Sequence, residues 1–278
     1  MTVSFIRNTN GFPVGYTSIT EIGEPIKDTG INFGILKLTA GEEITIDSRH
    51  ESAYLLLNGD VIISHDQIKY RANRQSLFEQ EPVAVHFSAH KMVSIKAMSE
   101  VEFAVMETIN IADFPTLIFD HTNMLESEHR GKGVLNDTSY RIVRTIFDTR
   151  NRPESKLVLG EVINFPGCWS SYPPHHHKQP EIYHYRFTEK NGYGHGELDD
   201  QIFKTENYST LKILDEQDHA QAAAPGYGMY YMWVIRHLPG NPYIQPEFTE
   251  AHNWTRTTNA NERVWLGSKE DILEVCEE

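Results

Sequence analysis

The sequence contains only two cysteines, Cys168 and Cys276, among its 278 residues. This scarcity excludes the disulfide framework that stabilises small secreted domains and is typical of a reducing compartment. The first residues lack the basic patch, apolar stretch and small-residue cleavage site of a signal peptide, so we expect a cytoplasmic protein. No apolar run approaches the roughly 20 residues that a membrane span requires, and no membrane partner is expected.

Basic residues are also few. The chain has 25 lysines and arginines against 39 aspartates and glutamates, which gives a formal net charge of −14. Such a chain has no general basic surface for polyanions, and nucleic acid is therefore excluded as a partner. If the ligand is itself an acid, its counter-charge must be local. A metal ion or one or two arginines in the site would supply that charge.

The residues that are abundant favour a β protein. Aromatic residues make up 11% of the chain, which suits β-sheets better than helical bundles. Short β-rich runs broken by turn residues occur from residue 31 to 108 and again after residue 140, while helical periodicity is scarcely visible. One short capped helix is predicted over residues 268–275. The fold class is therefore predicted to be all-β with few short helices.

A local turn signal stands out in the first half of the chain. Asn58-Gly59 lies between two apolar runs, residues 54–57 and 61–63. Both turn residues readily adopt the positive φ angles of a two-residue connection. The sequence therefore predicts a tight β-hairpin at this point.

A polar stretch from about residue 109 to 136, in which apolar alternation lapses, separates two β-rich halves of similar size. We divide the chain into an N-terminal barrel over residues 1–110, a linker with a connecting strand over 111–155, and a C-terminal barrel with a tail over 156–278. This pattern favours a duplicated barrel, and one large β-sandwich is the alternative.

Three consecutive histidines mark the segment that carries chemistry. Residues two apart on a strand share a face, so His175 and His177 can direct their imidazoles to one point while His176 faces away. A short turn at residues 178–180 would lead into a neighbouring strand and return the carboxylate of Glu181 to that point. One hairpin would then supply three metal ligands. The alternatives are a chance string of residues and a solvated turn.

A fourth ligand would come from a later strand of the same barrel. His195, His219 and His237 are in reach, and we favour His219 because it directly precedes a segment that enters a turn. Mixed nitrogen and carboxylate ligands suit one divalent transition metal and disfavour Ca and Mg. Zn is our first choice, ahead of Mn, Fe, Co and Ni.

A series of short motifs extends over about residues 125–235. The motifs are Arg130-Gly131 with Gly133, Tyr140-Arg141 with Val143, Leu159-Gly160-Glu161-Val162, Trp169-Ser170-Ser171-Tyr172-Pro173-Pro174-His175, Glu181-Ile182-Tyr183, Ala223-Ala224-Pro225-Gly226-Tyr227 and Tyr230-Tyr231. In order and approximate spacing they resemble the bicupin isomerases of sugar-acid catabolism. The resemblance is greatest to the 5-deoxy-glucuronate isomerase family, which is related to the deoxy-uronate ketol-isomerases.

The resemblance implies a tandem cupin fold of double-stranded β-helix (jelly-roll) barrels. In such a fold the N-terminal barrel has lost its site, and the C-terminal barrel holds the metal through His175, His177, Glu181 and His219. The implied activity is a metal-dependent aldose–ketose isomerisation in inositol catabolism, from 5-deoxy-glucuronate to 2-deoxy-5-keto-gluconate. We also expect a homo-oligomer that acts on a small sugar acid.

Such a reaction needs proton transfer next to the metal and a partner for the substrate's carboxylate. Tyr183 is the first choice for the hydroxyl, because it shares the face of Glu181; a role as a barrel-filling aromatic is the alternative. For the carboxylate we choose Arg236, with Arg141 and Arg186 as alternatives.

Three other functions are compatible with the same residues. A ketol-isomerase of pectin-derived deoxy-uronates would share the fold and the metal and differ in its substrate. A non-catalytic cupin would bind a sugar or store a metal without turnover. A metal-dependent dioxygenase would use the ligands for iron chemistry and would consume oxygen.

Overall fold

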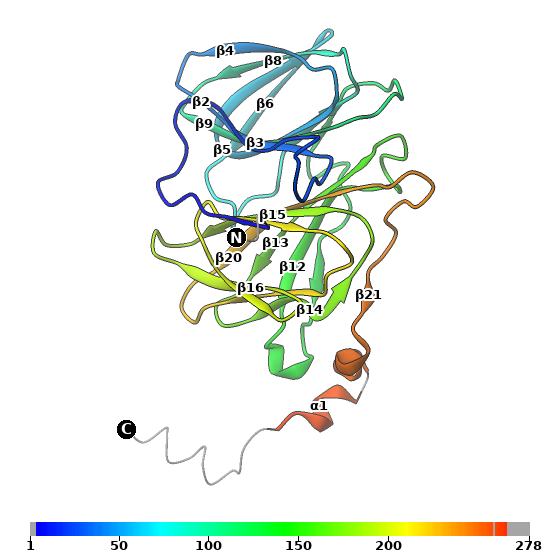
Figure 1. The fold of residues 1–278 in the computed structure, drawn as a ribbon. Coiled ribbons are helices and arrows are strands. Elements are labelled where there is room, and N and C mark those ends of the chain that lie inside the picture. Colours follow the sequence, from blue (N-terminus) through cyan, green and yellow to red (C-terminus); the bar gives the residue numbers. More distant parts are fainter. Residues whose placement is uncertain (1–3, 258, 266–278) are drawn as a thin grey trace.

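The computed structural model describes residues 4–257 and 259–265 (Figure 1). Antiparallel strands dominate this part of the chain, and its helical segments are short: η1 (Leu135–Asp137), η2 (Glu250–Arg256) and α1 (Ala260–Arg263). The prediction of an all-β fold with few short helices is confirmed. The helix predicted over residues 268–275 lies outside the described residues.

The N-terminal half forms the upper body of Figure 1, a curled nine-stranded sheet. Its strands are β2 (Gly15–Thr20), β3 (Asn32–Leu38), β4 (Glu43–Asp47), β5 (Glu51–His65), β6 (Ile68–Arg74), β7 (Ala84–Phe87), β8 (Met92–Ala97), β9 (Val101–Thr108) and β10 (Leu117–Phe119). Apolar side chains such as Leu56, Ile63, Phe87 and Phe103 fill its interior. Burial of this apolar surface stabilises the body.

The prediction of a tight hairpin at Asn58-Gly59 is wrong. Both residues lie inside β5, which continues to a turn at Asp66. Gly59 does have a positive φ of +112°, and the pairing of β5 with β9 shifts register between Leu56 and Asn58. A Cβ at Gly59 would lie 2.4 Å from the carbonyl oxygen of Glu100, so glycine is required here. The two residues therefore mark a β-bulge that bends one long strand, because bulges and tight turns use the same backbone angles.

The C-terminal half forms the lower body from two sheets. The seven-stranded sheet contains β1 (Phe5–Ile6), β18 (Thr210–Ile213), β15 (Glu181–Phe187), β20 (Met229–Arg236), β13 (Leu157–Asn164), β12 (Arg141–Phe147) and β11 (Glu128–Arg130). The five-stranded sheet contains β17 (Gln201–Glu206), β16 (Tyr193–Leu198), β19 (His219–Ala223), β14 (Trp169–His176) and β21 (Glu247–Phe248). One core cluster joins Tyr183 and Tyr185 of the first sheet to Leu198 and Ala223 of the second, so the sheets pack face to face.

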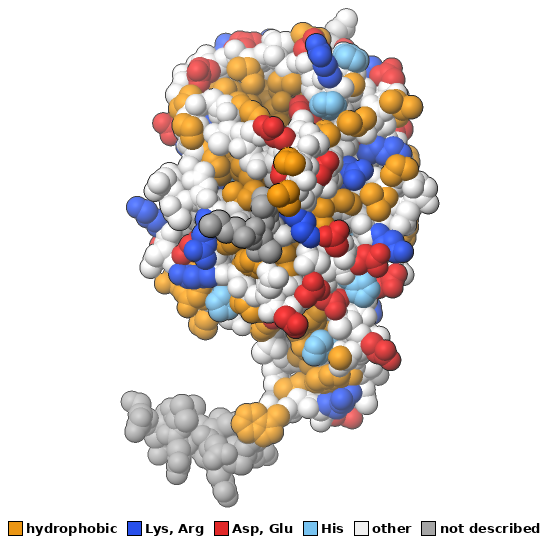
Figure 2. Space-filling view, in the orientation of Figure 1, with side chains coloured by type: hydrophobic (Ala, Val, Ile, Leu, Met, Phe, Trp, Pro, Cys, Tyr) orange, Lys and Arg blue, Asp and Glu red, His pale blue; other side chains and the backbone are white. Residues whose placement is uncertain are grey.

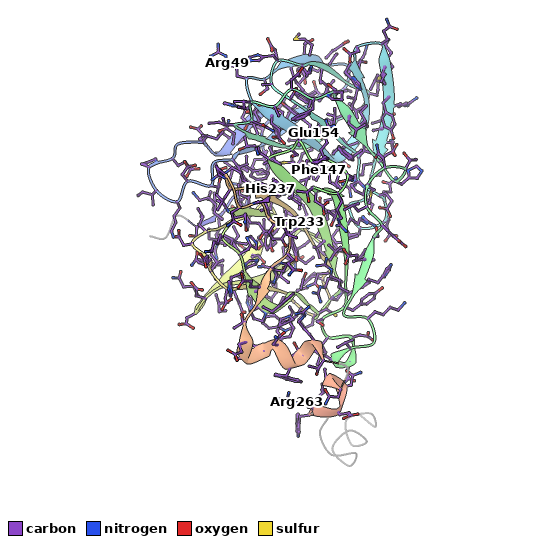
Figure 3. All side chains as sticks on the ribbon, turned by 90° about the vertical axis from the view of Figure 1, so that its right-hand side faces the viewer. Arg49, Phe147, Glu154, Trp233, His237 and Arg263 are labelled. Carbon is purple, nitrogen blue, oxygen red and sulfur yellow. The ribbon has the colours of Figure 1, made fainter. Side chains whose placement is uncertain are left out.

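An apolar layer joins the two bodies. It packs Phe33 and Leu55 of the N-terminal sheet against Phe147, Ile182 and Met232 of the seven-stranded sheet. Figure 3 shows Phe147 at the level where the bodies meet. Strand β15 is consequently buried on both faces, with its odd-numbered residues directed into the C-terminal barrel and Ile182 directed to the other body.

The domain boundaries drawn from the sequence remain a prediction. Strand β1 pairs with β18, so the first described residues belong to the sheet of the lower body.

Of the helices that the structure describes, none has the length and apolar character that a membrane crossing requires. On the face shown in Figure 2, basic side chains lie among acidic and apolar ones.

Candidate metal centre

Antiparallel pairing brings the candidate histidines together. Strands β14 and β19 place His175 directly opposite His219, and their ring centroids are 4.2 Å apart. His177 follows the end of β14, with its ring 5.4 Å from that of His219. His176 instead makes a hydrogen bond of 2.7 Å with Asp218. The alternation along β14 therefore separates His176 from the two histidines on either side of it.

Glu181 reaches the same point from the opposite sheet. It begins β15, which pairs with β18 and β20 rather than with β14. The prediction that a single hairpin supplies three ligands is therefore wrong. Strand β14 already has β19 and β21 as neighbours, so the turn at residues 178–180 carries the chain across the barrel instead. Candidate ligand atoms of His177, Glu181 and His219 lie within 4.8 Å of one another.

Each of the three imidazoles is oriented by a backbone carbonyl. The Nδ1 contacts are His175 to Ser171 O at 3.1 Å, His177 to Gln179 O at 2.8 Å and His219 to Gln217 O at 3.0 Å. A carbonyl oxygen only accepts, so each Nδ1 carries a proton, and Nε2 is the ring nitrogen that is left to bind a metal. Histidine ligands of metals are typically fixed in this way.

The other ring nitrogens of His177 and His219 converge on a carboxylate. The Nε2 atoms of His177 and His219 lie 3.1 and 3.4 Å from Oε2 of Glu181. All three side chains are buried, and Nε2 of His219 has no hydrogen-bond partner among the described residues. Two ring nitrogens and a carboxylate oxygen at these distances need a positive charge between them, which either a proton or a metal cation supplies. The donor set of imidazole nitrogen and carboxylate oxygen fits a divalent transition metal.

The ionisation of the group favours the same interpretation. Burial, followed by the neighbouring His219 and His177, holds the pKa of His175 well below 6.5. For Glu181, burial favours the neutral acid, but the close contacts with His177 and His219 outweigh burial and lower the pKa of the carboxyl below 4.5. Neutral imidazoles and an ionised carboxylate are the forms that bind metal.

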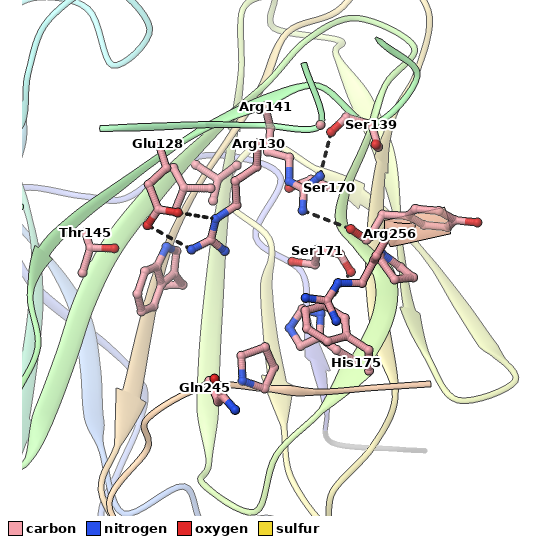
Figure 4. Close-up of a pocket in the computed structure, with 18 of the residues that line it drawn as sticks. Glu128, Arg130, Ser139, Arg141, Thr145, Ser170, Ser171, His175, Gln245 and Arg256 are labelled. Atoms are coloured by element: carbon pink, nitrogen blue, oxygen red, sulfur yellow. Dashed lines mark hydrogen bonds and ion pairs between the residues drawn. The ribbon is translucent and has the colours of Figure 1, made fainter. Parts of the chain in front are cut away.

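His175, His177 and Glu181 lie in the wall of a cavity of about 740 Å³ (Figure 4). Strands of both C-terminal sheets line it, together with residues from the segments 243–257 and 260–261. From this segment the ring of Tyr243 lies 4.9 Å from His177, and that of Phe248 lies 5.7 Å from His175. Sequence reasoning assigned no role to this segment, because its pairing with β14 joins residues about seventy positions apart.

Tyr183 lines the cavity on the same face of β15 as Glu181. Its hydroxyl lies 3.2 Å from Oγ of Ser171, which lies 3.1 Å from the hydroxyl of Tyr231. Burial raises the pKa of Tyr183 well above 10, so the hydroxyl keeps its proton. Sequence reasoning missed Ser171 and Tyr231, although both lie in the motifs that carry the family resemblance.

The structure does not bring Arg236 to the cavity. Ile235 lines the cavity, and the next residue of a strand points to the other face. The Nε of Arg236 accordingly donates a hydrogen bond of 2.8 Å to the carbonyl of Thr29. Of the two alternatives, Arg186 pairs with an acidic residue of the N-terminal body, whereas Arg141 lines the cavity.

Two β-barrel bodies, with a buried histidine–glutamate group in the second, define a protein of the cupin class. Solved structures with this architecture include an oxalate decarboxylase from Lactobacillus farciminis, with a TM-score of 0.62, 12% identity, and coverage of 95% of this chain and 92% of that chain. An IolB-like protein from Salmonella typhimurium LT2 has a TM-score of 0.78 and 22% identity, with coverage of 88% of this chain and 97% of that chain. The expected cupin fold is confirmed.

The family model described as KduI/IolB matches residues 6–255, and the chain belongs to this family. A relative from Bacillus licheniformis is 30% identical over 227 residues, which are 74% of this chain and 80% of the relative. Another, from Halalkalibacterium halodurans, is 27% identical over 246 residues, or 81% of this chain and 87% of the relative. Both are named 5-deoxy-glucuronate isomerase. The family resemblance read from the motifs is confirmed.

Proposed function

We propose that this protein is an aldose–ketose isomerase that converts 5-deoxy-glucuronate into 2-deoxy-5-keto-gluconate. One divalent transition metal, with Zn as the first choice, is held by His175, His177, Glu181 and His219. The proposal depends most on one observation: the carbonyl-fixed imidazoles of His177 and His219 converge on the buried carboxylate of Glu181, and His175 stands opposite His219. The names of the relatives supply the substrate. A cytoplasmic location and a homo-oligomeric state remain predictions.

The metal supplies Lewis-acid polarisation of the substrate's carbonyl and hydroxyl oxygens when it is bound. The protein's own side chains position the substrate and handle its protons. Tyr183 keeps its proton and donates a hydrogen bond to a substrate oxygen. Ser171 connects this hydroxyl to that of Tyr231, so the three hydroxyls form a path along which a proton can be shared.

The proposal is tested by elemental analysis of the purified protein together with an assay for ketone formation from 5-deoxy-glucuronate. We expect about one transition metal per chain, lost together with activity in His177→Ala. The matched control is His176→Ala, which removes the adjacent histidine that bonds to Asp218 instead. This control should keep both metal and turnover.

The outcomes separate the parts of the proposal. Absence of metal from the wild-type protein would overturn the metal centre. If the metal-loaded protein acts on a pectin-derived deoxy-uronate and not on 5-deoxy-glucuronate, the proposed reaction type stands and the proposed substrate is wrong. Metal without turnover on either sugar acid would favour a binding role.

A further inference from the structure

Arg141 is a buried cation in the cavity wall. Its side chain belongs to β12, and the residue is only 8% exposed. Two of its N–H groups donate to backbone carbonyls, at 2.7 Å to Ser139 and at 3.0 Å to Tyr172 (Figure 4). These neutral acceptors fix the plane of the guanidinium without supplying a counter-charge. Among the residues that the structure describes, no carboxylate pairs with it.

The other arginines of the cavity are either paired or exposed. Arg130 makes two hydrogen bonds to Glu128, of 2.9 and 3.0 Å. Arg150 pairs with Asp148 at 2.7 Å. Arg256 is exposed, with its guanidinium carbon 3.6 Å from the centre of an aromatic ring. Arg141 is therefore the buried cation of the cavity whose charge is available to a ligand.

The position of Arg141 is coupled to the candidate metal centre through one short stretch of backbone. The carbonyl of Ser171 accepts the hydrogen bond from His175, and the next carbonyl, that of Tyr172, accepts the one from Arg141. Consecutive peptide groups thus orient an imidazole and a guanidinium toward the same cavity. Burial lowers the pKa of Arg141 to about 10, so the side chain is still a cation at neutral pH.

We propose that Arg141 is the carboxylate-binding residue of this cavity and makes it selective for sugar acids over neutral sugars. An arginine presents five N–H donors in a fork, and a carboxylate binds two of them side by side. In a protein with a net charge of −14, an anionic ligand needs such a local cation. The inference rests on the proposed function, in which the carbonyl end of the same substrate lies at the metal.

The experiment compares two probes that differ in one group, D-glucuronate and its neutral amide, D-glucuronamide. Their binding to the full-length, metal-loaded protein is measured by calorimetry. We expect the wild type to prefer the carboxylate by about 10-fold or more, the range of a hydrogen bond to a charged group. Arg141→Met should abolish this preference and change binding of the amide by less than about 2-fold. Arg141→Lys should retain part of it, because a lysine offers charge without the fork.

Arg130→Met and Arg256→Met test the competing cations of the same cavity. Loss of the preference in either variant, with the preference intact in Arg141→Met, would overturn the assignment. Equal binding of both probes by the wild type would also overturn it. Metal content and thermal unfolding of each variant establish that it is folded, and Arg141→Lys serves as the test if the methionine variant is not.

The failure of the proposed function is distinguishable from that of the subsite. If the protein prefers the carboxylate through Arg141 but forms no ketone from 5-deoxy-glucuronate, the isomerase assignment is wrong and the assignment of the carboxylate subsite stands. If the protein forms the ketone and Arg141→Met leaves KM unchanged, the proposed reaction stands and the assignment of the carboxylate subsite is wrong.

Discussion

His175 and His219 face each other as a register pair of β14 and β19, with their ring centroids 4.2 Å apart. Directly opposed residues of an antiparallel pair have their side chains on the same face of the sheet. The two rings therefore stand on the face of the sheet that Glu181 approaches from the other sheet. The metal centre is thus proposed to join the two sheets of the C-terminal barrel.

Removal of metal should destabilise the protein. A ligand that binds only the folded state stabilises it by about 2.7 kcal/mol when its free concentration is one hundred times Kd. We expect a chelator to lower the midpoint of thermal unfolding and added metal to restore it. His219→Ala should show little response to either treatment. A wild-type midpoint that is insensitive to both would contradict a structural contribution from the metal.

Replacement of Tyr183 by phenylalanine should lower kcat by about 100-fold or more, because a positioned proton donor contributes 10²–10⁴-fold. Metal content should not change, since this hydroxyl contacts Ser171 rather than a ligand atom. The matched control is Tyr185→Phe, whose hydroxyl bonds to Gln221 and does not line the cavity. Steady-state kinetics and elemental analysis are the measurements. Similar turnover in the two variants would leave Tyr183 as a packing residue.

Glu161→Gln should destabilise the contact between the two bodies. The buried Glu161 carboxylate accepts hydrogen bonds from Arg74 at 2.7 Å and from Arg144 at 3.0 Å. Breaking a buried ion pair costs about 3–5 kcal/mol, because the remaining charge is left uncompensated. Glu43→Gln, in an exposed pair with Lys96, should cost less than about 1 kcal/mol. Denaturant unfolding measures both, and equal losses would contradict the role of Glu161.

Stability should fall as the pH is lowered through about 6.5. Burial, together with Arg186, holds the pKa of His184 well below 6.5, and burial also lowers the pKa of His86. In the unfolded chain both regain a pKa near 6.5, so below that pH the unfolded state binds more protons than the folded state. Each group then removes up to about 1.4 kcal/mol per pH unit.

The measurement for this pH effect is urea unfolding at several pH values from about 7.5 to 5. His184→Gln should reduce the slope of the unfolding free energy against pH by up to one proton, whatever its effect on stability at neutral pH. A wild-type slope of zero across this range would contradict the neutral state of the buried histidines.

Features that depend on near neighbours in the chain could be predicted from the sequence. The two-residue period of a strand sets His176 apart from its neighbours and places Tyr183 on the face of Glu181. The all-β class follows from the density of aromatic residues and turns, and the family follows from the order of the motifs. The strand period follows from backbone geometry, and the fold class and the family follow from patterns along the chain, so none of them requires knowledge of which strands pair.

The tertiary structure decided which strands pair. Strand β14 is flanked by β19 and β21, so Glu181 comes from the facing sheet, and residues from 243–257 and 260–261 line the cavity. Asn58-Gly59 bends a strand instead of ending it, since the same positive φ suits a bulge and a turn. Arg236 follows the cavity-lining Ile235 on β20, so its side chain points away from the cavity, whereas Arg141 lies in the cavity wall. Register and strand neighbours arise from packing between residues far apart in the sequence, and local patterns do not specify them.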